Sequence, residues 1–168
     1  MVNVARFDIQ LVPATSWGKS LANLARQGEG FRRVWETIRQ RELERAGYKC
    51  EICGDSGKVM PCHEKWCYDE ASHVQKLVGY AITCRDCSNV LHMGRASTNP
   101  ELWKVAIAHF TKVTGLTKRD FERAFRQAMD EWARRSRHRW HIDVSHELLA
   151  RGFEDQINRL SWEKGKQK

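Results

Sequence analysis

Residues 50–87 read CEICGDSGKVMPCHEKWCYDEASHVQKLVGYAITCRDC and contain all six cysteines of this chain of 168 residues. Two Cys-x2-Cys pairs bound the stretch, with Cys50 and Cys53 at its start and Cys84 and Cys87 at its end. At this spacing one tight turn presents two thiolates as two corners of a tetrahedron, so two turns complete a four-sulfur shell. The pairs therefore predict one structural zinc ion. A closed shell leaves no position for water, so we expect this ion to take no part in catalysis.

The thirty residues between the two pairs exceed the usual spacing of a zinc ribbon and predict an inserted structural unit. Residues 58–66 and 74–82 have the composition of strands, and the second is rich in Val, Leu, Tyr and Ile. Residues 84–96 have the spacing of a short helix that starts at Cys84. We therefore expect a β-hairpin followed by a helix, held together by the zinc ion.

The composition indicates a folded protein of the cytoplasm. Hydrophobic residues make up 41% of the chain and charged residues 30%, which argues against global disorder. No run approaches the roughly 18 apolar residues of a membrane-spanning helix, and the first ten residues lack the layout of a signal peptide. Since thiols stay reduced in the cytoplasm, the clustered cysteines favour metal binding over a disulfide framework. We expect no membrane partner.

The net charge of +8 is unevenly distributed along the chain. Residues 1–49 contain nine basic and five acidic residues, residues 50–94 contain four and six, and residues 95–168 contain sixteen and ten. Basic flanks around an acidic centre suit a protein that binds a polyanion and holds cations in its middle. A solvated basic surface without a polyanionic partner fits the same distribution.

Helices are expected on both sides of the cysteine-rich centre. The helical patterns fall over residues 17–27, 31–46, 102–113, 121–132 and 145–160. The core-facing stripe of the third comprises Leu102, Val105, Ala106, His109, Phe110 and Val113. Residues 4–12 and 140–144 are expected to be extended. The predicted fold class is α+β, with an N-terminal helical segment at 1–47, a zinc-bound core at 48–96 and a C-terminal helical region at 97–168.

Further motifs lie between and after the two Cys pairs. They are His63-Glu64-Lys65-Trp66, Tyr68-Asp69, Val74-Gln75-Lys76-Leu77 and His92-Met93-Gly94-Arg95-Ala96. Together with the Cys pairs, their order and spacing resemble the HNH endonuclease family, in particular small bacterial and phage HNH proteins. The resemblance is strong over residues 48–96 and looser in the flanks. It implies a ββα-metal core, in which a hairpin and a helix hold one divalent cation against a scissile phosphate of DNA.

The resemblance assigns roles to two histidines. His63, on the first strand, would be the general base that deprotonates the attacking water, which suits an imidazole with a pKa near about 6.5. His92 would help to hold the catalytic cation, which is Mg²⁺, Mn²⁺, Ni²⁺ or Zn²⁺ and stabilises charge on the phosphate and the leaving oxygen. The implied activity is metal-dependent hydrolysis of phosphodiester bonds in DNA.

Three positions depart from the family pattern. Ser88 stands where the family commonly has a second helical histidine, four residues before His92, and Cys62 stands where many members have a His or Asp ligand. Cys67 stands where a Glu is expected. A thiolate prefers zinc or another soft ion over Mg²⁺. Either Cys62 and His92 hold the cation with a carboxylate such as Asp86, or the chain is a catalytically impaired, zinc-stabilised DNA-binding or protein-interaction module. A third alternative is an unproductive second zinc ion bound by Cys62, Cys67, His63 and His92.

Arginines on both sides of the centre are candidates for contacts with DNA phosphates. They are Arg32, Arg33 and Arg39 in the N-terminal segment, Arg134 and Arg135 in the C-terminal region, and Arg95 beside the helix of the core. Phosphate contacts raise affinity without reading bases, so we expect binding that depends strongly on salt and weakly on sequence. His73, His109, His138, His141 and His146 have no partner spacing and are expected to be surface or core residues.

Overall fold

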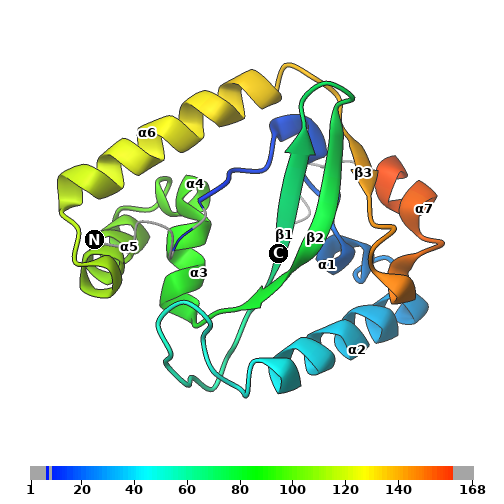
Figure 1. Cartoon of the computed structure of the whole chain (residues 1–168), viewed down its shortest axis with the longest axis horizontal. Coiled ribbons are helices and arrows are strands. Elements are labelled where there is room, and N and C mark those ends of the chain that lie inside the picture. The colour runs from blue at the N-terminus through cyan, green and yellow to red at the C-terminus, as the bar shows by residue number, and fades with distance from the viewer. Residues whose placement is uncertain (1–6, 8, 161–168) are drawn as a thin grey trace.

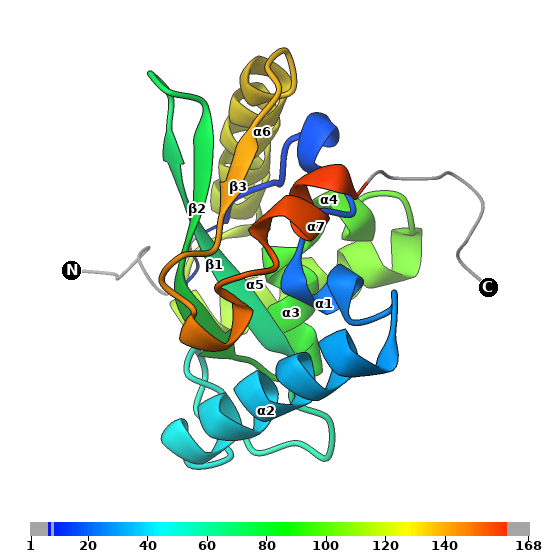
Figure 2. The same ribbon diagram turned by 90° about the vertical axis from the view of Figure 1, so that its right-hand side faces the viewer.

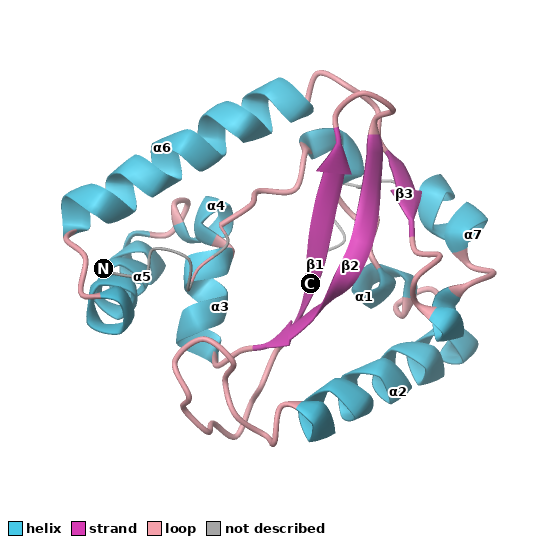
Figure 3. Ribbon diagram, in the orientation of Figure 1, coloured by secondary structure: helices cyan, strands magenta, loops and turns pink. Residues whose placement is uncertain are grey.

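The computed structural model describes residue 7 and residues 9–160 of the chain. In chain order the elements are η2 (Ala14–Ser16), α1 (Leu21–Leu24), α2 (Glu29–Arg45), β1 (Cys62–Asp69), β2 (Val74–Ile82), α3 (Arg85–Leu91), α4 (Met93–Ala96), α5 (Pro100–Thr114), α6 (Lys118–Arg135), β3 (His141–Asp143), η3 (Leu148–Ala150) and α7 (Glu154–Arg159). The strands form one mixed sheet in the order β1-β2-β3, with helices around it (Figures 1 and 3). The α+β class predicted from the sequence is therefore confirmed.

The hairpin of β1 and β2 lies at the centre of the molecule. The two strands pair antiparallel along their whole lengths, with one bulge between Lys65 and Trp66. β2 has the predicted bounds, whereas β1 begins at Cys62 and ends later than expected. Pro61 directly precedes β1, and since proline has no N–H to donate, it suits the position just before a strand.

Two helices follow the hairpin where the sequence predicts one. α3 begins after Cys84, whose sulfur accepts a hydrogen bond from the Cys87 backbone N–H. The backbone of His92 has φ −97° and ψ 39°, which ends α3, and α4 begins at the next residue. His92 therefore sits at the junction of two helices rather than inside one.

The three long helices α2, α5 and α6 lie where the sequence predicts helices. Local sequence explains their ends. The side chain of Asn99 caps α5, and Gly115 ends that helix with a φ of +73°. Thr117 and Asp120 form a capping box at the start of α6.

The ends of the described chain differ from expectation. The helix expected over residues 17–27 is reduced to α1, because Gly18 adopts a φ of +81° shortly before the Ser20 cap. Residues 9–12 form no strand, and the earlier part of that predicted segment lies outside the described residues apart from residue 7. The last predicted helix is divided into η3 and α7, with Gly152 at a φ of +157° between them.

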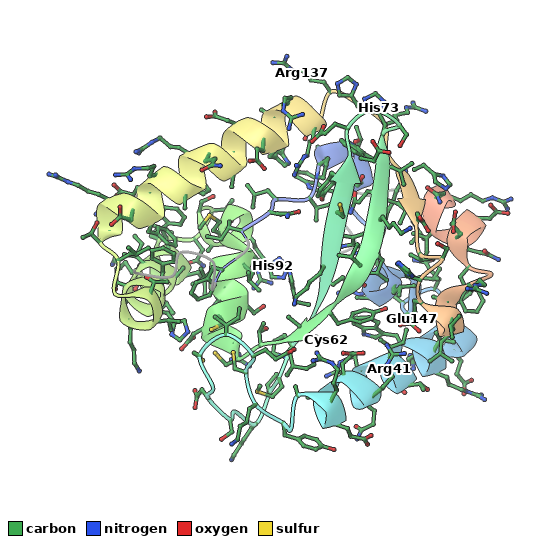
Figure 4. The ribbon with its side chains drawn as sticks, viewed as in Figure 1. Arg41, Cys62, His73, His92, Arg137 and Glu147 are labelled. Carbon is green, nitrogen blue, oxygen red and sulfur yellow. The ribbon has the colours of Figure 1, made fainter. Side chains whose placement is uncertain are left out.

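The C-terminal segment returns to the sheet and to α2. β3 pairs parallel with the first three residues of β2. Shortly after β3 in the chain, Glu147 accepts hydrogen bonds from Arg41 of α2 at both of its carboxylate oxygens, at 3.1 and 2.7 Å (Figure 4). Figure 2 shows β3 beside β2 and α2 across the end of the hairpin opposite its tip. Segments from both flanks therefore complete the structure around the hairpin.

Two hydrophobic clusters lie on the two sides of the hairpin. One contains Phe110 of α5, Phe121 of α6 and buried cysteines, and the other contains Ile38 of α2, Leu77 of β2 and Ile142 of β3. In Figure 1, helices α3 to α6 lie on one side of the hairpin and α2, β3 and α7 on the other. Among the described residues, no helix combines the length and the apolar character that a membrane crossing requires.

Candidate metal centre and adjacent histidine pair

The four cysteines of the two pairs come together next to the start of α3. The sulfur atoms of Cys50, Cys53, Cys84 and Cys87 all lie within 4.8 Å of one another. Cys53 is half-buried, the other three cysteines of the cluster are buried, and none forms a disulfide. The sequence prediction of a four-cysteine cluster that can hold a metal ion such as zinc is therefore confirmed.

Hydrogen bonds shape the turn that carries the first pair. The Gly54 N–H donates to the Cys50 carbonyl at 2.8 Å, and the Cys50 N–H donates to the Asp55 carbonyl at 2.8 Å. Gly54 has a φ of +80°, a left-handed conformation that glycine adopts without a Cβ clash. The turn thus folds back on itself and brings Cys53 close to Cys50.

Glu51 fastens this turn to β2 and to α2. Its backbone N–H donates to the Ile82 carbonyl at 2.9 Å, and its carboxylate accepts from the Ile82 N–H at 2.7 Å. Arg45, the last residue of α2, donates to both Glu51 carboxylate oxygens at 2.8 Å. Hydrogen bonding by Arg45 lowers the pKa of Glu51, so the pair is ionic at neutral pH. The first Cys pair is thereby held beside the end of β2, two residues before Cys84.

The pKa values of the clustered cysteines are shifted by their contacts with one another and by burial. A hydrogen bond from the Cys87 thiol lowers the pKa of Cys50 to about 4, and burial raises the pKa of Cys53 to about 11. The hydrogen bond to Cys50, followed by burial, raises the pKa of Cys87. A bound divalent cation deprotonates each sulfur that coordinates it, and four converging thiolates suit zinc.

A histidine of α5 also contacts this cluster. Nε2 of His109 lies 3.0 Å from Sγ of Cys87. The sequence places His109 on the core-facing stripe of its helix but does not predict this contact. The signal in the sequence was the position of His109, a titratable residue, among apolar residues on the core-facing stripe of its helix.

His63 and His92 lie beside one another at the end of α3 that is opposite to Cys84. Their ring centroids are 5.0 Å apart and their planes meet at 69°. His63 is half-buried on β1, and Figure 4 shows His92 between α3 and the hairpin. The fold thus brings together the two histidines to which the family resemblance assigns catalysis.

Both histidines are held in their neutral form. Burial, and then the nearby His92 and Lys65, lower the pKa of His63 to about 4. His92 is exposed by its accessible surface, and desolvation by neighbouring groups, followed by the Arg95 guanidinium, lowers its pKa. At pH 7 the two rings are therefore uncharged, so each has a nitrogen lone pair able to accept a proton or bind a metal.

The structure does not gather Cys62 with the two histidines. Because successive side chains of a strand point to opposite faces, Cys62 and His63 diverge. Cys62 packs against both hydrophobic clusters near α2, and burial raises its pKa to about 12. Cys67 and Asp86 are exposed. Within the described part of the chain, the four cysteines are the single group of three or more Cys, His, Asp or Glu side chains that could hold a metal ion.

Glu64 also faces away from His63. Its Oε1 accepts a hydrogen bond from the Ala22 N–H at 3.0 Å, at the start of α1. The side chain is almost fully buried, and this burial raises its pKa to about 7. Glu64 therefore supports the hairpin from its other face and does not orient the His63 ring.

The arginines singled out from the sequence have different surroundings. Arg134 and Arg135 both bind Glu70 near the tip of the hairpin, and Arg135 also covers the Tyr68 ring. Of the remaining candidates, Arg33 pairs with Glu29, Arg95 donates to Asn89 Oδ1 at 3.4 Å, Arg32 is exposed, and Arg39 is half-buried. Arg134 and Arg135 thus fix the hairpin tip to α6.

α6 carries three further arginines that the sequence reasoning missed. Arg119, Arg123 and Arg126 are exposed, and their spacing of four and three residues places them on one helical face. This face is opposite to the one that buries Phe121 and Ala128. The helical spacing of the three basic residues was the signal in the sequence.

Comparison of the chain with protein-family models, with curated proteins and with solved structures finds no match. The function of the site is therefore argued from its residues and their geometry.

Proposed function

We propose that this chain is a metal-dependent DNA endonuclease of the HNH type, with a ββα-metal core formed by β1, β2 and α3. One observation carries the proposal: two neutral histidines lie with ring centroids 5.0 Å apart, one on the first strand and one at the end of the following helix. The motif order of the sequence assigns a base and a metal ligand to these same two positions.

His63 would act as the general base. Its lowered pKa of about 4 keeps the ring neutral at pH 7, so it can accept a proton from an attacking water molecule. A base with a low pKa removes protons less readily than one near neutrality, so binding of substrate and cation beside His63 must assist the step.

Of the described residues, His92 would hold a catalytic divalent cation. Such a cation supplies charge stabilisation on the phosphate and the leaving oxygen when it is bound. Two histidines do not complete a coordination shell, and Ser88 offers only a hydroxyl one helical turn before His92. The proposed role of His92 therefore requires further ligands from water and the DNA phosphate.

The four-cysteine cluster would hold a structural zinc ion that fixes α3 to the hairpin. In this proposal it serves the histidine pair indirectly, because it sets the position of the helix that ends at His92. Exposed arginines, including Arg119, Arg123 and Arg126 of α6, would supply contacts to phosphates that depend on salt.

Nicking of supercoiled plasmid DNA tests this function. Zinc-loaded protein is incubated with Mg²⁺, Mn²⁺ or Ni²⁺, beside His63→Ala and, as a matched control, His146→Ala, whose histidine is exposed in the segment between β3 and η3. We expect nicking by the wild type and by His146→Ala, and a loss of about 100-fold or more in His63→Ala. Nicking that is equal in all three proteins contradicts the assigned base.

The second candidate function is a zinc-stabilised DNA-binding or protein-interaction module. It is favoured by the lack of a third metal-ligating side chain beside His63 and His92 among the described residues. In that case no metal supports nicking, while gel-shift assays still detect DNA binding that weakens steeply with salt. Absence of both nicking and DNA binding leaves the protein-interaction role.

A further inference from the structure

We infer that His109 is a positioning residue of the metal centre, which donates a hydrogen bond from Nε2–H to the Cys87 thiolate and so governs how firmly the cluster holds its metal. The inference depends on the four-cysteine cluster and not on nuclease activity. It goes beyond the four ligands themselves, because His109 belongs to a different helix, 22 residues further along the chain.

Geometry supports the direction of this hydrogen bond. The Nε2 atom of His109 lies 3.0 Å from Cys87 Sγ, well inside the range for a bond to sulfur. A metal-bound thiolate has lost its proton and can only accept. The ring must therefore carry a proton on Nε2, and the contact becomes a charge-assisted hydrogen bond that offsets part of the negative charge on sulfur.

The surroundings make this interaction effective. Cys87 is fully buried, and His109, on α5, is half-buried. In such a setting water competes little for the thiolate, and a hydrogen bond is stronger than at an exposed site. Groups that bond to metal ligands orient them, and their loss typically weakens metal binding by about 10- to 100-fold.

Packing gives the contact a second consequence. α3, which carries Cys87, packs extensively against α5, which carries His109, and Phe110 beside His109 is buried in the same cluster of apolar side chains. His109 therefore connects the metal centre to the C-terminal helices. The position of α5 and the electronic state of the cluster are linked through a single side chain.

Cobalt substitution tests the inference directly. In the Co²⁺-loaded protein, the energy of the sulfur-to-cobalt charge-transfer absorption reports the electron density on the thiolates. Removal of a hydrogen bond raises that density, so we expect His109→Ala to shift the band to longer wavelength. His109→Gln, which places an amide N–H near the same position, should restore much of the wild-type spectrum, and His146→Ala should leave it unchanged.

Zinc release gives an independent readout on the same proteins. With a colorimetric chelator in excess, we expect His109→Ala to lose zinc about 10- to 100-fold faster than the wild type, with His109→Gln in between. Unshifted cobalt spectra and equal release rates in all variants would show that His109 merely packs α5 against α3. X-ray absorption that finds three sulfurs and one nitrogen around zinc would also overturn the inference, since His109 would then be a ligand.

Discussion

The four-cysteine cluster and the His63–His92 pair lie at the two ends of α3 and are built in different ways. Each cysteine pair sits on its own turn, so local sequence specifies half of the cluster at a time. Backbone N–H groups of Gly54 and Glu51 that donate, together with the Asp55 carbonyl and the Glu51 carboxylate that accept, hold the first turn. The histidine pair joins the open end of the hairpin to the end of a helix, and within the described residues no third metal-ligating side chain completes a group with it. The four sulfurs suffice for a closed metal shell, whereas under the proposed function the pair would require substrate or solvent to complete its site.

The difference teaches how the two sites divide the work. A complete shell of four sulfurs contributes binding energy to folding, because the metal binds only the folded arrangement. An incomplete pair of neutral histidines contributes little to folding, and under the proposed function this pair would act on the substrate. Substitutions at and around the two sites should therefore change stability and metal binding by amounts that can be ranked.

The largest effect is expected from Cys84→Ser. This change removes one metal ligand and the sulfur that caps α3. Structural zinc sites supply on the order of 10 kcal/mol of apparent binding energy, so the centre of the protein should unfold or lose most of its stability. Zinc content, near-UV circular dichroism and the midpoint of thermal unfolding measure the outcome. Cys67→Ser, at an exposed cysteine, is the control, and equal stability of the two variants would contradict the metal centre.

Glu64→Gln should change the pH dependence of stability. The pKa of Glu64 is raised to about 7 in the folded state, so its contribution is fully present below its unfolded pKa near 4.5 and is lost as the pH rises through 7. At about 1.4 kcal/mol per pH unit, the wild type loses on the order of 3 kcal/mol across this window, and the variant does not. Chemical denaturation with saturating zinc at pH 5 and pH 8 measures both proteins. A stability difference that is constant between these pH values would show that Glu64 is not buried on the far face of β1.

Ser88→His should supply the ligand that the histidine pair lacks. The His92 N–H donates to the Ser88 carbonyl at 2.9 Å, so the two residues lie one helical turn apart on the same face. Two imidazoles at this spacing should bind Ni²⁺ or Mn²⁺ about tenfold more tightly than one, and nicking should rise with metal occupancy. Calorimetric titration of zinc-loaded protein measures the second site. Ser97→His, which gains no histidine neighbour at this spacing, should bind as the wild type does.

Arg45→Met tests the smallest effect, the support that α2 gives to the first Cys turn. Arg45 binds the carboxylates of both Glu51 and Glu42. Since half of the Arg45 side chain is exposed, we expect a loss of about 1 kcal/mol that shrinks with added salt. Arg33→Met removes a largely exposed pair with Glu29 and should change the unfolding free energy by less than about half of that. Urea unfolding at low and high salt separates the two variants.

The sequence predicted the parts of the molecule that short-range spacing controls. The Cys-x2-Cys pairs predicted the cluster, the composition of residues 74–82 predicted β2 to the residue, and helical periodicity located α2, α5 and α6. Each of these depends on residues close together in the chain. The same reasoning failed where one backbone angle decides the outcome, as at Gly18, His92 and Gly152.

Long-range contacts were the other part that the sequence did not predict. The contact of His109 with Cys87 requires knowledge of how α5 packs on α3, and the bond between Glu64 and Ala22 requires the position of α1 under the hairpin. The family resemblance made Cys62 a candidate ligand, whereas its packing against both hydrophobic clusters depends on long-range contacts that the sequence does not show. Pairs separated by tens of residues are set by packing, which no local pattern records.

The parallel pairing of β3 with β2 has a consequence for how the protein forms during its synthesis. A ribosome delivers residues 62–82 long before residues 141–143, so the hairpin emerges with one edge unpaired and Gln75 without the cover of Ile142. The metal cluster, complete at residue 87, needs no later segment for its ligands. Capture of the ion by the nascent chain would therefore give the growing polypeptide a stable nucleus, on which the helices and the third strand settle as translation ends.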